Sequence, residues 1–276
     1  MPTNDFQYLI ILIIKQISFK IEKLYLDCID DQGNCFILYW AKVEFFLMRF
    51  VYSGLVFCNA KGFTTEKSTL HKTNKPVIDR IIQFNHKLLK TNIKFNRTDD
   101  AIIRLLYKDS NNNELIWNCH HPKGWAEIIH NDSIYKGFGY AETLISQIKP
   151  WNLPIDELKW GRFLSDFYTV IWINWLGKYP INKIFINGIE FNDAIFKDDI
   201  ISFNNDTYRL KFSEIQLIRE GKLSGLFSRM TLLKMFLNRR ILNTIEIKYK
   251  SRTSFSKNSE LLSNGWSIFE IVPWGR

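Results

Sequence analysis

Apolar and polar positions alternate with a period of two along most of the chain, in short runs that end at turn-forming residues. Residues 24–29 and 35–42 flank a glycine-containing turn at 30–34, a pattern that predicts a β-hairpin. Residues 101–108 and 114–120 flank a turn rich in asparagine and predict a second hairpin. The dominant pattern is therefore that of strands joined by tight turns.

Further strands are predicted at 139–148, 157–164, 168–175, 206–217, 244–253 and 265–274, and Asn187-Gly188 is a two-residue hairpin turn. The polar segment 59–74 is expected to be a long loop. So many short strands predict an all-β barrel or sandwich and exclude a doubly wound α/β fold. A proline- and tryptophan-rich connector begins at Pro150, so we expect two barrel-like halves, 1–149 and 150–276.

One segment breaks the two-residue period. Residues 223–242 have leucine, phenylalanine and methionine at spacings of three and four, with basic residues between them, which predicts a short amphipathic helix in the second half. Two roles are open for it. It caps one barrel end, or it is a basic helix that covers an entrance or makes transient contact with a membrane.

Composition supports the β prediction, since 46% of the residues are apolar and 15% are aromatic. The net charge of +9 would suit a nucleic-acid partner. However, most lysines and arginines occur singly within alternating segments, as on solvated strand faces, so nucleic-acid binding is disfavoured.

Known chemical motifs are missing from the sequence. The four cysteines form no CxxC pair, and no GxSxG, Walker, GxGxxG-helix or HExxH pattern occurs, so we expect neither a metal nor a cofactor. The apolar run 9–14 is too short to span a membrane and lacks the flanks of an export signal. Buried free thiols and a cytoplasmic location are expected.

The candidate site lies within residues 135–175, where Glu142 and Arg162 are embedded among aromatic residues and are the two predicted catalytic residues. Burial among aromatic rings disfavours the charged form of a carboxyl group and would make Glu142 an acid able to protonate an alkene. The alternative is that Glu142 and Arg162 form a structural salt bridge between the halves. We expect the following side chains to line the ligand pocket: Tyr39, Trp117, His120, Tyr140, Trp160, Trp172 and Trp175.

His120 and His121 are adjacent on a predicted strand, so without a bulge they point to opposite faces and do not share a metal ion. His120 is either an inward hydrogen-bonding group or part of a surface turn beside Pro122.

The segments 27–41, 137–142, 150–163 and 265–274 resemble the lipocalin-like superfamily that includes hydroxyneurosporene synthase (carotenoid 1,2-hydratase), tocopherol cyclase and related bacterial proteins. The resemblance implies two packed calycin-type β-barrels with a hydrophobic small molecule at the barrel mouth or between the halves. It also implies that an acid, here Glu142, protonates an isoprenoid double bond.

These observations predict a protein that binds a hydrophobic small molecule such as an isoprenoid or polyketide-like lipid. If it is an enzyme, the expected reaction is acid-assisted hydration, cyclisation or isomerisation. Two alternatives are open: a carrier or sensor without catalysis, and a β-sandwich that binds glycans or nucleic acid through exposed tryptophans.

Overall fold

The computed structural model describes residues 19–45, 48–222 and 242–274. The strands of its first half are β1 Phe19–Asp30, β2 Cys35–Phe45, β3 Met48–Cys58, β4 Thr64–Thr69, β5 Ile81–His86, β6 Thr91–Arg97, β7 Ile102–Lys108, β8 Glu114–His130 and β9 Ser133–Ser146. They form one antiparallel sheet in the order β4-β3-β2-β1-β9-β8-β6-β5, with β7 paired to β8. A single 3-10 turn, η1 Lys87–Leu89, joins β5 to β6.

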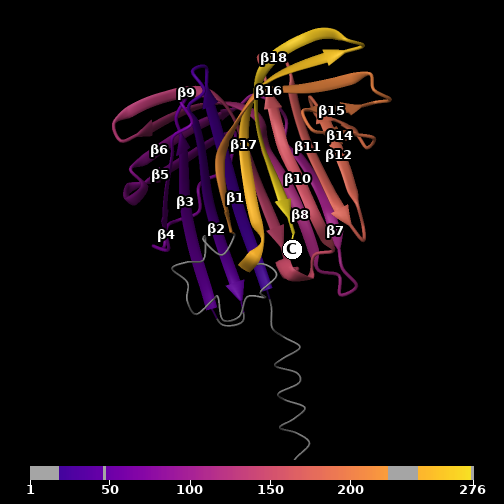
Figure 1. Ribbon diagram of the computed structural model, residues 1–276. Coiled ribbons are helices and arrows are strands. Elements are labelled where there is room, and N and C mark those ends of the chain that lie inside the picture. Colours follow the sequence, from indigo (N-terminus) through magenta and orange to yellow (C-terminus); the bar gives the residue numbers. More distant parts are fainter. Residues whose placement is uncertain (1–18, 46–47, 223–241, 275–276) are drawn as a thin grey trace, which may run out of the picture.

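The strands of the second half are β10 Ile155–Leu164, β11 Thr169–Gly177, β12 Ile181–Ile186, β13 Ile189–Phe191, β14 Ile195–Lys197, β15 Ile200–Phe203, β16 Tyr208–Lys222, β17 Ile245–Lys257 and β18 Glu260–Pro273. They form a second antiparallel sheet in the order β13-β12-β11-β10-β18-β17-β16-β15-β14. In Figure 1 β2 to β6 of the first sheet lie on the left and β10 to β15 of the second on the right, while β7 of the first sheet reaches to the lower right.

The two sheets share one topology. In each, the first strand of the half pairs with the last, β1 with β9 and β10 with β18, and the second and third strands extend the sheet on the other side. The chain is thus all-β, with two curled, half-barrel sheets that correspond to two lipocalin-like halves. This confirms the predicted fold class.

Two apolar clusters join the halves. One contains Tyr25, Tyr39 and Trp117 from the first sheet and Trp160 and Phe185 from the second. The other packs Leu115 of the first sheet against Ile155 and Trp175 of the second. The other side chains of β1 and β2 pack into a separate core of the first half, together with β5 and β6. Because both faces of β2 are covered, its residues 35–40 are all buried, and the sequence there is a continuous apolar run.

The predicted hairpins at β1–β2, β7–β8 and β12–β13 are confirmed by their registers. The predicted loop at 59–74 is wrong, because β4 lies within it and pairs with β3. Its side chains are polar and mostly exposed, as befits an edge strand that is held by backbone hydrogen bonds, so the apolar pattern gave no signal.

The connector between the sheets holds a 3-10 turn, η2 Pro150–Asn152, between the end of β9 and the start of β10. The domain boundary at 149/150 falls in this turn and stays a prediction. The structure does not describe residues 1–18 and 223–241. The apolar run 9–14 and all but the last residue of the predicted helix at 223–242 therefore lie outside the described residues. Within the described chain, no helix has the length and apolar character needed to cross a bilayer, and the cytoplasmic location stays a prediction.

Candidate functional site

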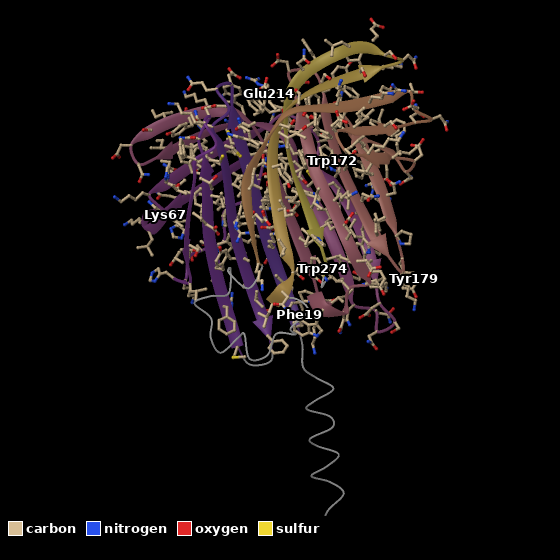
Figure 2. The ribbon with its side chains drawn as sticks, in the orientation of Figure 1. Phe19, Lys67, Trp172, Tyr179, Glu214 and Trp274 are labelled. Atoms are coloured by element: carbon tan, nitrogen blue, oxygen red, sulfur yellow. The ribbon has the colours of Figure 1, made fainter. Side chains whose placement is uncertain are left out.

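A cavity of about 160 Å³ lies between the two sheets, near the connector. Aliphatic side chains of both halves make up half of the residues that line it, and four tryptophans add their indole rings: Trp117, Trp160, Trp175 and Trp274. Four charged side chains also line it: Lys23, Glu142, Glu246 and Glu270. In Figure 2 the labelled Trp274 and Phe19 lie at the lower end of the sheets, and both contact the connector, Trp274 through Pro150 and Phe19 through the Trp151 ring.

Glu142 on β9 is the acid predicted from the sequence. It is buried, and its Oε2 accepts hydrogen bonds from the Tyr140 hydroxyl, at 2.6 Å, and from Trp117 Nε1. Tyr140 comes two residues earlier on the same strand face, and Trp117 reaches over from β8. Both donors are neutral, and among the described residues none donates to Oε1.

Burial raises the pKa of Glu142 above its usual value, and the hydrogen bonds from Tyr140 and Trp117 offset only part of that rise. The ammonium groups of Lys23 and Lys248 act in the same lowering direction but more weakly. The carboxyl group therefore keeps its proton to a higher pH than an ordinary glutamate does, in a cavity whose wall is largely apolar. This is the environment of a general acid.

Two residues of the cavity wall, Glu246 and Glu270, belong to a charged network. Lys248 on β17 contacts Glu246 Oε1 at 3.2 Å and pairs with Glu270 on β18. Arg219 on β16 contacts Glu246 Oε2 at 2.8 Å and Glu66 on β4 at 3.0 Å. This network ties the second sheet to the edge of the first.

The buried network shifts the pKa values of Lys248 and Glu246. Burial lowers the pKa of Lys248 to about 8, and the attraction of Glu246 opposes that fall. Burial alone would raise the pKa of Glu246, but Lys248, Lys23 and Arg219 lower it below its usual value. Glu246 is thus held as a carboxylate.

Arg162 does not contact Glu142. Its guanidinium binds Asp27 on β1, with Nη2 at 2.5 Å and Nε at 3.1 Å from Oδ1, and its Nη1 donates to the Trp266 carbonyl. Tyr25 adds a hydroxyl donor to Asp27 at 3.0 Å. The alternative of a Glu142–Arg162 salt bridge is therefore wrong, because Asp27 takes the guanidinium. The buried pair does join the two halves, through a different acid.

Only some of the other predicted ligand-binding residues lie at the cavity. Trp117, Trp160 and Trp175 line the cavity, and Tyr140 bonds the acid that faces it. Trp172 packs against Phe212 and Phe269 in the core of the second half, and Tyr39 is buried in the inter-sheet core beside Tyr25. Neither of these two lines the cavity.

His120 lies outside the cavity too. A bulge between Cys119 and His121 interrupts the alternation of β8. His120 contacts the Thr143 hydroxyl at 2.8 Å, and Thr143 points to the opposite face of β9 from Glu142. His121 packs edge-on against Phe95 in the core of the first half. Within the part of the chain that is described, no group of three or more His, Cys, Asp or Glu side chains is arranged to hold a metal ion.

Sequence reasoning missed Glu246, Lys248, Glu270 and Asp27. The strand β17 reads IEIKYK, and its alternating charges suggested a solvated face. In the structure Glu246, Lys248 and Lys250 of this strand are buried, while Ile245 is exposed. The one available signal was that Glu270 interrupts an otherwise apolar run, SIFEIV, on a strand near the chain end.

No protein-family model matches this sequence, and neither does any curated protein. Solved structures do. A protein assigned as AttH from Nitrosomonas europaea superposes with a TM-score of 0.55 at 8% identity, over 95% of this chain and 94% of that one. Kievitone hydratase from Nectria haematococca gives 0.56 at 9% identity, over 92% and 88%. CghA with Sch210972 gives 0.55 at 8% identity, over 94% and 89%.

At such low identities the likeness concerns the fold alone. It extends over nearly the whole of each chain, so both halves and their mutual arrangement are shared. The part of the sequence resemblance that concerned the fold is confirmed: this chain has the fold of the two-half, lipocalin-like proteins.

Proposed function

We propose that this protein binds the apolar end of a small molecule in the inter-sheet cavity, and that Glu142 protonates a carbon–carbon double bond there. One observation carries the proposal. A buried carboxyl group with a raised pKa and only neutral hydrogen-bond donors faces a cavity whose wall is largely apolar and aromatic.

The size of the cavity limits the ligand. An engineered apolar cavity of about 150 Å³ holds one benzene molecule, and this one measures about 160 Å³. A group of five or six carbons fits, such as one isoprene unit or one ring, and a longer molecule must extend beyond it. The indole faces of Trp117, Trp160 and Trp175 would stabilise a positive charge that forms on such a group.

The fold likeness is consistent with this proposal, since kievitone hydratase is by name a hydratase and CghA has been crystallised with Sch210972. Neither likeness specifies a substrate for this chain. A carrier without catalysis would use the same cavity and differ only in what Glu142 does.

The test uses 2-methyl-2-butene, a five-carbon alkene, as the probe. Binding is followed by the fluorescence of the cavity tryptophans, and protonation by incubation in D₂O with mass spectrometry of the recovered alkene. We expect binding and deuterium incorporation by the wild type. Glu142→Gln should bind the alkene within about threefold of the wild type and lose incorporation.

A matched control is Glu260→Gln, since Glu260 is exposed at the start of the β18 strand. It should behave as the wild type does. Binding without any incorporation would favour the carrier, and the absence of binding would refute the cavity proposal.

A further inference from the structure

The shared topology of the two halves places a second glutamate in the position that corresponds to Glu142. Across β1 and β9, Glu142 is in register with Tyr25. Across β10 and β18, Glu270 is in register with Trp160. Each acid therefore lies on the last strand of its half, beside an aromatic residue of the first strand.

These two aromatic residues touch each other. The Tyr25 and Trp160 rings meet edge to face with their centroids 5.1 Å apart, and the Tyr140 ring is 5.5 Å from that of Trp160. Since both glutamates also line the cavity, they approach it from the two sheets.

The two acids differ in what surrounds them. Glu142 has neutral donors, whereas Glu270 pairs with the buried Lys248. Glu246 also faces the cavity, but both its oxygens are occupied, by Lys248 and by Arg219. Among the described residues, none donates a hydrogen bond to Glu270 Oε1. That oxygen is the carboxylate atom left free to act on a ligand.

We propose that Glu270 is the general base that partners Glu142, and that the reaction at this site is the addition of water to a double bond. Lys248 is a positioning residue that keeps Glu270 ionised. This inference rests on the proposed function and extends it, because it selects hydration from among the acid-assisted reactions.

Hydration moves one proton from Glu142 to the alkene and one from water to Glu270. The Glu142 carboxyl group gives its proton to one alkene carbon, and the π electrons form the new C–H bond, leaving a cation on the neighbouring carbon. A water oxygen then forms a C–O bond to that carbon while Glu270 takes a proton from the water. The product is an alcohol, with Glu142 as the carboxylate and Glu270 protonated, and exchange of one proton with solvent restores the starting state.

One experiment separates this inference from the proposed function. With 2-methyl-2-butene in D₂O, deuterium incorporation reports protonation, and 2-methyl-2-butanol, measured by gas chromatography, reports water addition. The wild type should give both, and Glu142→Gln neither. Glu270→Gln should keep incorporation and lose at least tenfold in alcohol formation. Glu260→Gln, on the same strand, is the control.

Each outcome is decisive. No incorporation by the wild type overturns both proposals. Incorporation without alcohol, or alcohol formation by Glu270→Gln at the wild-type rate, overturns this inference and leaves the proposed function standing. Urea unfolding of each variant verifies that a lost activity does not come from a lost fold.

A second measurement needs no substrate. At a pH just above the usual titration range of glutamate, the wild type should show an infrared C=O band of a protonated carboxyl group that is lost in Glu142→Gln and retained in Glu270→Gln. Lys248→Met should add a second such band, and Glu270→Gln in the Lys248→Met background should remove it. A wild-type band that disappears in Glu270→Gln instead would reverse the two roles and refute the assignment.

Discussion

Removal of the Arg162 guanidinium should weaken the contact between the two halves and lower the free energy of unfolding. Arg162 and Asp27 have fully buried side chains on the first strands of the two halves. Replacing Arg162 with Met keeps an unbranched apolar stem but leaves the Asp27 carboxylate with the Tyr25 hydroxyl and without its cation. It also removes the bond to the Trp266 carbonyl.

The expected loss follows from this geometry. Breaking a buried ion pair by removal of one partner costs about 3–5 kcal/mol, because the other charge stays buried. Replacement of both partners by apolar residues is often neutral or stabilising. We therefore expect Arg162→Met to lower the free energy of unfolding by about 3–5 kcal/mol, and Asp27→Leu in the same chain to restore most of it.

Urea unfolding followed by tryptophan fluorescence measures both variants, and the single variant Asp27→Leu completes the double-mutant cycle that gives the coupling energy of the pair. Arg209→Met is the control, because Arg209 pairs with Asp206 on the surface and its loss should leave the midpoint unchanged. A loss below about 1 kcal/mol for Arg162→Met, or a double variant no more stable than the single one, would refute the reasoning.

Three further predictions concern protonation, backbone packing and thiol reactivity. The folded protein raises the pKa of Glu142 above its unfolded value, near 4.5. The stabilisation that the protonated Glu142 contributes is therefore complete below that pH and is lost as the pH rises through the folded pKa. Glu142→Gln should flatten this part of the stability profile measured by urea unfolding, and an unchanged profile would contradict the assignment. A Cβ on Gly139 would come within 2.2 Å of the Asp27 carbonyl oxygen, whereas one on Gly221 would come no closer than 3.3 Å to the end of the Arg219 side chain. Gly139→Ala should therefore lower the thermal midpoint by several degrees more than Gly221→Ala. Equal midpoints would count against the tight β1–β9 contact. Burial raises the thiol pKa of three of the four free cysteines, Cys28, Cys35 and Cys119. Iodoacetamide should label these three only after unfolding, as read by mass spectrometry. Rapid labelling of the native protein would disprove their burial.

The acid Glu142 could be picked out from the sequence because local features carried the information. A charged residue between a glycine-aromatic run and β-branched neighbours is unusual on a strand, and the structure buries it. The partner of Arg162 was missed for a non-local reason, since Asp27 is 135 residues away and reads as part of a hairpin end.

The strand β17 shows the limit of pattern reading most clearly. Its alternation correctly predicted a strand, but the charged face was assigned to solvent and is instead buried against the first half. Period-two alternation specifies which residues share a face. It does not specify which face another sheet will cover.

The sequence by itself determined the strands, the tight turns and the all-β class, because these depend on neighbouring residues and on the spacing of apolar side chains. Only the tertiary structure decided that Arg162 binds Asp27, and that Glu142, Glu246 and Glu270 meet at one cavity. The physical reason is that a charge between two sheets is satisfied by whichever partner the packing brings within a few ångströms, and that partner comes from a distant strand.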